Sequence, residues 1–416
     1  MGKGDYNVII MHYLLLYCLV AVFGIDQGSA LSSFEHSDTA TQHRHNAAKV
    51  GARWRNLDEQ MKGSHFILSQ VPTALTSSHC GNKSGLQGAC LGLVGIYSHP
   101  AHLERRVLHR STWLRFKPPG IDFVFILGQP DSEIENKTGY PYYENLVRWE
   151  QSLYGDLLIL NTHEVDTHLS GTKSFAFFSW AALHAGKWPE SNYLFIAKCD
   201  DDAIVNPLQL RLLLMQLALR GGDTTNTNRH GTENQAETAV LSMPPPPTFW
   251  GLTSSKFDKK QGVKTEWMWG AFYLVSADVA MEATLSEDQL KAAALLPEDV
   301  AMAKAFTTII PSEKWTQALP CEIYNHEHAF DGVDPQSLLW GRYNQRRTYS
   351  KETIAAHELK RHHVFMEAFS ELLPFMEAMH RDCWEWFEQE KDHSYLTRPA
   401  EQCRRWHSSS LKCSSS

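Results

Sequence analysis

Short apolar segments alternate with amphipathic segments from Leu91 onward, and this alternation restricts the possible folds more than any other feature of the sequence. The apolar segments have the length of strands, whereas the segments between them have the apolar spacing of helices. Strands are expected at 91–97, 122–127, 156–160 and 193–198, and helices at 102–113, 142–154 and 172–186. This order predicts an α/β fold, with a mostly parallel sheet flanked by helices.

The pattern continues in the second half of the chain with one interruption. A helix is expected at 207–219, strands at 248–253 and 271–276, and a further helix after Pro297. Residues 221–247 are low in hydrophobicity and end in four prolines, so we interpret them as a flexible insertion within the domain. No element is assigned beyond Gly332, and 408–416 is expected to be a frayed tail.

The N-terminal part of the chain has a different character. An apolar stretch without a formal charge runs from Val8 to Gly24, near the lower limit of about 17 to 25 residues for a membrane span. The expected divisions are a cytoplasmic tail at 1–7, a transmembrane signal anchor at 8–27, a stem at 28–90 and a globular domain at 91–407. A cleaved signal peptide is the alternative, because Gly28-Ser29-Ala30 offers small residues for a peptidase. Either way, the domain is expected in the secretory lumen.

Glycosylation triplets and cysteines bear on the same compartment. Asn82 and Asn136 each begin an N-x-[ST] triplet, the acceptor pattern for N-glycosylation. Of eight cysteines, Cys18 lies in the apolar stretch, and an odd seven remain, so at least one is free or pairs between chains. Cys199 lies in an apolar run and is expected to be buried. The net charge of -8 makes nucleic acid a poor default partner.

Three adjacent aspartates, Asp200-Asp201-Asp202, directly follow the strand expected at 193–198. In an open α/β sheet this is the carboxyl edge, where ligands bind. Hard divalent cations prefer carboxylate oxygens and also take phosphate, so adjacent acids can hold a metal and a diphosphate. A solvated turn or helix N-terminus favours the same residue type. The triplet by itself supports both interpretations equally.

The triplet is one of several blocks that occur in a fixed order. Lys198-Cys199-Asp200-Asp201-Asp202 is followed by Val205-Asn206. The other blocks are Arg106 and Arg110 with Thr112-Trp113 in the pattern R-x-x-x-R-x-T-W, Phe125-Ile126-Leu127-Gly128, Glu150 with Tyr154-Gly155-Asp156, Lys173 with Trp180, and Glu298-Asp299-Val300. Together they resemble the superfamily of β-1,3-galactosyltransferases and β-1,3-N-acetylglucosaminyltransferases, over about half of the chain.

The resemblance implies an inverting enzyme with a GT-A fold, in which a Rossmann-like nucleotide half is joined to an acceptor half. It implies that Asp202 binds the metal, usually Mn2+, and that Asp200 and Asp201 contact the nucleotide or support the ligands. His357 is similar to a family histidine that also touches the metal. A surface or core histidine is the alternative for His357.

Arg106 and Arg110 lie four residues apart, on one face of the helix expected at 102–113. A guanidinium fork bonds phosphate oxygens bidentately, which suits a diphosphate pocket. We therefore favour nucleotide contacts for both arginines, with ordinary salt bridges as the alternative.

The acceptor segment of the family has a counterpart around Gly270. Phe272 stands where the family usually has glycine, which puts acceptor and sugar specificity in doubt. Trp267 and Trp269 are candidates for stacking on a sugar ring, although aromatic residues at strand spacing are more often core. We place Trp267, Trp269, Gly270 and Glu298 in the acceptor and sugar pocket.

By family register, Asp299 is the base that takes the proton from the attacking hydroxyl. General-base catalysis typically contributes about 10²- to 10⁴-fold, and an ordinary aspartate with a pKa of ~3.9 is ionised near neutral pH. The alternative is a helix-start acid, because Pro297 precedes Glu298-Asp299.

The sequence therefore predicts a hexosyltransferase that moves galactose from UDP-galactose to a glycan hydroxyl in β-1,3 linkage. UDP-N-acetylglucosamine is the alternative donor. A catalytically silent glycan-binding protein is the alternative of another class, and the intact Asp200, Asp202 and Asp299 argue against it. The expected location is the Golgi membrane, with a single-pass type II anchor and a lumenal domain.

Overall fold

The computed structural model describes residues 72, 90–129, 142–163, 171–185, 193–219, 245–258, 263–284, 295–318, 322–325, 349 and 352–383. All of them belong to the second of two units of the chain, Leu68–Ser416. The predicted anchor, nearly all of the stem, most of the insertion, the tail and both glycosylation triplets lie outside them. Among the helices in these ranges, none is long and apolar enough to cross a membrane.

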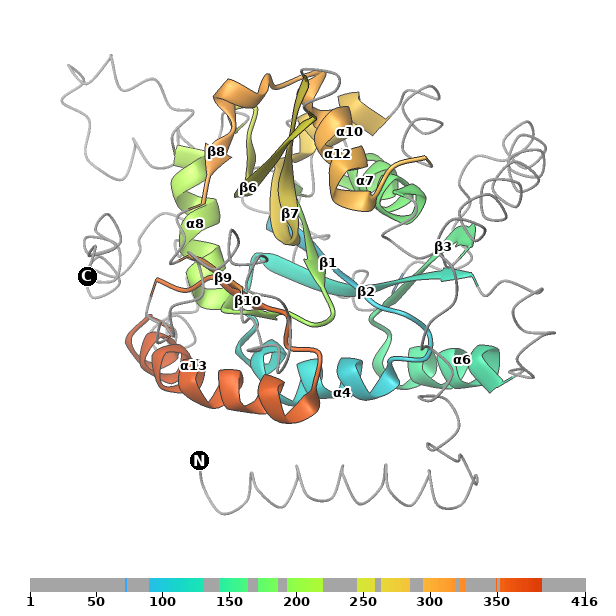
Figure 1. Cartoon of the computed structure of the whole chain (residues 1–416). Helices are drawn as coiled ribbons and strands as arrows, with labels where there is room; N and C mark the ends of the chain where they lie inside the picture. The colour runs from blue at the N-terminus through green and yellow to red at the C-terminus, as the bar shows by residue number, and fades with distance from the viewer. Residues whose placement is uncertain are drawn as a thin grey trace, which may run out of the picture. The chain divides into compact units, whose positions relative to one another are not determined.

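A seven-stranded sheet with the order β3-β2-β1-β4-β7-β6-β8 lies at the centre of the described domain (Figure 1). Its strands are β1 (Cys90–Tyr97), β2 (Ile121–Gln129), β3 (Leu157–His163), β4 (Tyr193–Asp200), β6 (Phe249–Asp258), β7 (Val263–Ser276) and β8 (Thr316–Gln317). The pairs from β3 to β4 are parallel, β7 is antiparallel to both its neighbours, and β8 is parallel to β6. The predicted α/β class with a mostly parallel sheet is confirmed.

Helices cover both faces of this sheet (Figure 1). One group contains α7 (Thr172–Ala185), α10 (Ala277–Thr284) and α12 (Glu298–Thr307). The other contains α4 (Leu103–Ser111), the 3-10 helix η2 (Trp113–Phe116), α8 (Pro207–Leu219) and α13 (His362–Cys383), while α6 (Tyr142–Tyr154) packs beside β3. Gly95 of β1 allows one close approach, because a Cβ there would lie 2.5 Å from the Phe177 ring of α7.

A second, three-stranded sheet joins distant parts of the chain. It consists of β5 (Ile204–Val205), β10 (Ala355–His357) and β9 (Ile323–Asn325). β10 is antiparallel to β5 and parallel to β9. Since β5 follows the acidic triplet directly, this small sheet brings the segment that ends in His357 back to the triplet.

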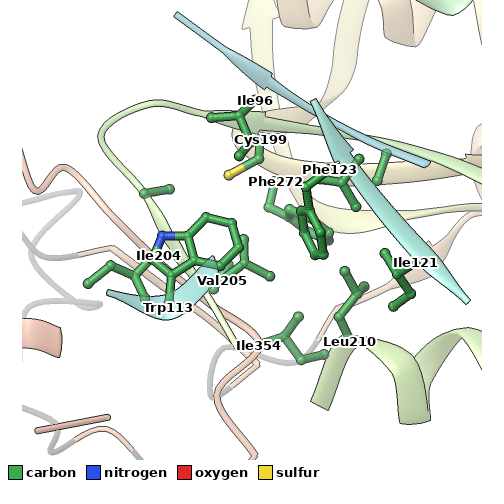
Figure 2. Packing of buried hydrophobic residues seen from close by; sticks show 14 of the residues in the cluster. Ile96, Trp113, Ile121, Phe123, Cys199, Ile204, Val205, Leu210, Phe272 and Ile354 are labelled. Carbon is green, nitrogen blue, oxygen red and sulfur yellow. The ribbon is translucent and has the colours of Figure 1, made fainter. Parts of the chain in front are cut away.

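The core beneath the acidic triplet contains Cys199 and Phe272, the residue at the usual glycine position. Cys199 and Phe272 are paired neighbours on β4 and β7, and both are 0% exposed (Figure 2). Cys199 is a free thiol, so the prediction that it is buried is confirmed. Phe272 packs edge to face on Trp250 inside this core. The side chain at the usual glycine position thus fills the core.

Candidate active site

The acidic triplet lies where the strand order reverses. β1 is flanked by β2 on one side and β4 on the other, and Asp200, the last residue of β4, pairs with Tyr97, the last residue of β1. Such a switch point at the carboxyl ends of parallel strands leaves a crevice for ligands, because the connecting segments diverge to opposite faces. The topology therefore places the aspartates at the expected binding edge.

Asp200, Asp202 and His357 form a cluster with one possible ligand atom each, and these atoms lie within 4.8 Å of one another. His357 Nε2 is 3.1 Å from Asp202 Oδ1 and 3.4 Å from Asp200 Oδ2. Two carboxylates and an imidazole are a suitable donor set for a divalent cation such as Mn2+. Burial opposes a charge on His357, but hydrogen bonds to the two carboxylates outweigh it and raise its pKa to about 9. A cation held by these residues would take the place of that proton, since a ligating imidazole is neutral.

Backbone contacts hold the two halves of this cluster together. The Leu359 N–H donates to the Asp202 carbonyl over 2.9 Å, and the Asn206 N–H donates to the Ile354 carbonyl over 2.8 Å. Between them, Glu358 has a φ of 64°, a left-handed conformation that non-glycine residues rarely adopt. This turn directly after His357 redirects the chain, so that Leu359 can reach the triplet.

Lys198 is a residue of this site to which the sequence analysis gave no role. Its side chain is 1% exposed, and its Nζ lies 2.5 Å from Asp200 Oδ1 and 3.0 Å from Glu298 Oε2. It also donates to the Gly270 carbonyl over 2.5 Å. Lys198 thus connects the end of β4 with β7 and with the start of α12. The sequence feature that could have indicated this role is a lysine inside an otherwise apolar strand.

The start of α12 carries two acids with different surroundings. Glu298 is buried and accepts hydrogen bonds from the Tyr273 hydroxyl and from Lys198. Asp299 is partly exposed, and its Oδ1 accepts the Val300 N–H over 2.8 Å. Burial and then the charge of Glu298 raise the pKa of Asp299 to about 6, so the ordinary value expected from the sequence is wrong. An aspartate with this pKa still ionises near neutral pH and is a stronger base than usual.

The residues predicted for the acceptor pocket lie at different depths. Gly270 borders the Lys198 cluster, because a Cβ there would lie 3.1 Å from Nζ and 3.4 Å from Glu298 Oε2. Trp267 and Trp269 are partly exposed, whereas Met268 between them is buried. Glu298 is occupied by protein partners, so we assign it a supporting role behind the pocket.

Arg106 and Arg110 are held in ion pairs behind the site. Arg106 is 0% exposed, and its five N–H donors are taken by Glu150, Ser98 and two backbone carbonyls. A side chain without exposed surface cannot contact a nucleotide, so the nucleotide role predicted for Arg106 is replaced by a structural one. Arg110 donates bidentately to Asp156 and also pairs with Glu150.

These ion pairs explain two of the sequence blocks. The guanidinium of Arg110 lies 4.0 Å from the centroid of the Tyr154 ring, and Gly155, with a φ of 66°, lets the chain turn from α6 into β3. Asp156 follows and pairs with Arg110. The blocks R-x-x-x-R and E-x-x-x-Y-G-D therefore form one clamp between α4 and α6, in which Glu150 touches both arginines.

Asp201 turns toward α4, unlike its two neighbours. Ser98 Oγ donates to it over 2.9 Å, His102 Nδ1 lies 2.8 Å away, and Arg105 pairs with it at 2.8 Å. Burial opposes its charge, but the contacts with His102 and Arg105 hold the pKa of Asp201 well below its usual range. Asp201 thus anchors the turn that carries Asp202.

His109 supports the same turn from below. Trp113 Nε1–H donates to its Nδ1 over 2.7 Å, so the proton of the neutral ring sits on Nε2, which donates to the Asp201 carbonyl over 2.9 Å. The ring is 0% exposed, and burial lowers its pKa to about 4. His109 thus tethers the turn that carries Asp202 to α4.

Comparisons with known proteins agree with these blocks. The chain matches the galactosyltransferase family over residues 104–308. Mouse UDP-GlcNAc:betaGal beta-1,3-N-acetylglucosaminyltransferase 8 is 31% identical over 114 residues, which cover 27% of this chain and 26% of that enzyme. Beta-1,3-galactosyltransferase pvg3 of Schizosaccharomyces pombe is 24% identical over 313 residues, which cover 64% of this chain and 70% of that enzyme.

Among solved structures, the bifunctional glycosyltransferase WbbM aligns over 73% of this chain and 54% of its own, with 10% identity and a TM-score of 0.36. That score is too low to add to the assignment. The family match spans the triplet, Lys198 and the start of α12, while His357 lies beyond it and is brought in by β10. Over residues 104–308 the chain therefore matches the galactosyltransferase family, and the relatives that it resembles are named as β-1,3-glycosyltransferases.

Proposed function

We propose that this protein transfers a hexose from a UDP-sugar to a glycan hydroxyl, with a divalent metal held by Asp200, Asp202 and His357. The observation that carries the proposal is this cluster of two carboxylates and one imidazole at the switch point of the sheet. Manganese is the metal we favour, because the family resemblance implies it and carboxylate oxygens suit it. When bound, the cation supplies positive charge to balance the diphosphate of the departing UDP.

Asp299 is the proposed catalytic base. It lies at the start of α12, next to Glu298, which is joined to the metal cluster through Lys198. Its carboxylate accepts the proton of the acceptor hydroxyl as that oxygen attacks the anomeric carbon. The pKa of about 6 makes Asp299 ionised at neutral pH and protonated in more acid solution. Attack opposite the leaving UDP inverts the anomeric centre, so an α-linked donor gives a β-linked product.

Galactose is the donor sugar we favour, transferred in β-1,3 linkage. The relative that matches the larger share of this chain, 64%, is named a beta-1,3-galactosyltransferase. N-Acetylglucosamine is the second candidate, because the mouse relative is named a beta-1,3-N-acetylglucosaminyltransferase. Trp267 and Trp269, both partly exposed on β7 beside Gly270, are the proposed sugar-contacting side chains.

We also propose that the protein resides in the Golgi membrane as a single-pass type II protein. The support is the apolar stretch at 8–24 and the glycosylation triplets at Asn82 and Asn136, which suit a lumenal domain. Microscopy of the tagged full-length chain and sensitivity of its glycans to a glycosidase test this placement.

A donor screen tests the proposed activity. The full-length protein is incubated with UDP-galactose or UDP-N-acetylglucosamine and a panel of glycan acceptors, with MnCl2 or with EDTA. We expect metal-dependent transfer from UDP-galactose that Asp202→Asn abolishes. Transfer from UDP-N-acetylglucosamine alone would select the second donor, and an absence of transfer and of UDP release with either donor would refute the proposal.

A further inference from the structure

Lys198 has no ordinary reason to be buried. A lysine at the end of a strand usually reaches solvent, and burying its charge is costly unless the charge is paired. Here the side chain is 1% exposed and lies between two aromatic rings, with Nζ 5.2 Å from the Tyr97 centroid and 5.8 Å from the Tyr273 centroid. The fold therefore encloses the Lys198 ammonium group in a specific buried environment.

The ammonium group is fully used by the protein. A lysine ammonium has three N–H donors, and Nζ has three oxygen partners: Asp200 Oδ1, Glu298 Oε2 and the Gly270 carbonyl. No donor is left for a phosphate or a sugar. Lys198 consequently acts on the reaction through the residues that it holds.

The partners of Lys198 belong to the proposed metal-binding part of the site and to the part that carries the proposed base. Asp200 is a proposed metal ligand at the end of β4, and Glu298 immediately precedes the proposed base Asp299 on α12. The site concentrates four carboxylates, those of Asp200, Asp202, Glu298 and Asp299, at neighbouring positions. Without a cation between them, Asp200 and Glu298 would repel each other and move apart.

We propose that Lys198 is a positioning residue that fixes the distance between the metal-binding edge of the sheet and the base-bearing start of α12. This inference rests on the proposed function, since it needs Asp200 as a ligand and Asp299 as the base. The Tyr273 hydroxyl, 2.5 Å from Glu298 Oε1, completes the support from β7. Gly270 lies beside it, and a Cβ there would come 3.1 Å from Nζ, close enough to shift the ammonium group.

The charges around Asp299 provide a measurement that separates this role from a purely structural one, namely the acid limb of the pH–rate profile. The charges acting on Asp299 are those of Glu298 and Asp200, which raise its pKa, and that of Lys198, which lowers it. Removing Lys198 should therefore move the acid limb of the pH–rate profile upward. Removing the charge of Glu298 should move it downward. A general loss of stability predicts no such pair of opposite shifts.

The experiment uses full-length Lys198→Met, Lys198→Arg and Glu298→Gln proteins, with Lys173→Met as the matched control. Lys173 is a second buried lysine, on α7, and donates to the Ser98 carbonyl. Transfer is measured against pH at saturating MnCl2, together with thermal unfolding of each variant. We expect Lys198→Met to lower kcat about tenfold or more, because misplaced groups lose their alignment. We also expect its acid limb to shift upward by about half a pH unit.

The other variants keep the proposal testable if Lys198→Met does not fold. Lys198→Arg retains the charge but not the geometry, so its acid limb should stay in place while kcat falls. Glu298→Gln should shift the acid limb downward, and Lys173→Met should leave it unchanged. A wild-type protein without metal-dependent transfer would refute the proposed function itself. A wild-type kcat in Lys198→Arg, or an unshifted acid limb in folded Lys198→Met, would refute only the role of Lys198.

Discussion

Replacing Asp299 with asparagine should make the protein more stable and far less active. The asparagine keeps the shape of the side chain and can still accept the Val300 N–H, but it cannot take a proton. Transfer should fall by at least about 10²-fold, the low end for general-base catalysis. Metal-dependent binding of UDP should survive, because the triad of Asp200, Asp202 and His357 is untouched.

The stability gain follows from the pKa of Asp299. The folded protein raises it from the ordinary value of 3.8 to about 6, so the folded state binds a proton more tightly than the unfolded chain does. The contribution of Asp299 to stability is therefore fully present below pH 3.8 and is lost as the pH rises through 6. A difference of about two pKa units corresponds to about 3 kcal/mol at pH 7.5 and to about half of that at pH 5. Asparagine has no carboxyl group to ionise, so the Asp299→Asn protein avoids this loss of folding free energy.

The assay is denaturant unfolding of the wild type and Asp299→Asn at pH 5 and pH 7.5, in metal-free buffer. Metal is omitted because a bound cation lowers the pKa of a nearby carboxyl. Asp278→Asn, at an exposed position of α10, serves as the control and should change little. If Asp299→Asn were less stable than the wild type and transferred sugar within a few-fold of it, Asp299 would be a helix-start acid and the reasoning would be wrong.

Three further predictions concern the parts around the base. Binding of Mn2+ at 100 times its Kd should stabilise the wild type by about 2.7 kcal/mol, seen as a higher Tm, and His357→Ala should lose most of this gain. Gly270→Ala should lower kcat about tenfold while UDP affinity stays the same, because the methyl group displaces Lys198 Nζ. Arg106→Met should destabilise the protein by up to about 3 to 5 kcal/mol, because it removes one of the two guanidinium partners of the buried Glu150. Adding Glu150→Leu should restore stability and UDP binding. If the folded double variant still failed to bind UDP, Arg106 would have to contact the nucleotide directly.

Much of the architecture could be predicted because its signals are local. The apolar spacing of α6 and α8 predicted their observed bounds, Tyr142–Tyr154 and Pro207–Leu219. β7 begins at Val263, earlier than predicted, because its first half mixes charged and aromatic residues. The long helix α13 was not predicted, although its apolar residues pack in the core, since the region before it showed no clear period.

The site was harder to predict because its partners are distant in the sequence. The pairing of β10 with β5 brings His357 to Asp202, and only the resemblance indicated this. A guanidinium fork suits a phosphate and a carboxylate equally well, so the sequence could not show that Arg106 binds Glu150. Nor could it show that Lys198 is buried, because strand alternation gives the face of a side chain but not what covers it.

Calorimetry of UDP binding tests the metal-dependent nucleotide site most directly. UDP is titrated into the full-length wild type, Asp202→Asn and the control Asp278→Asn, each with MnCl2 and with EDTA. We expect the wild type and the control to bind UDP only with MnCl2, and folded Asp202→Asn to lose that binding, because one of the three proposed metal ligands is gone. Unchanged affinity for UDP and Mn2+ in a folded Asp202→Asn protein would contradict the account.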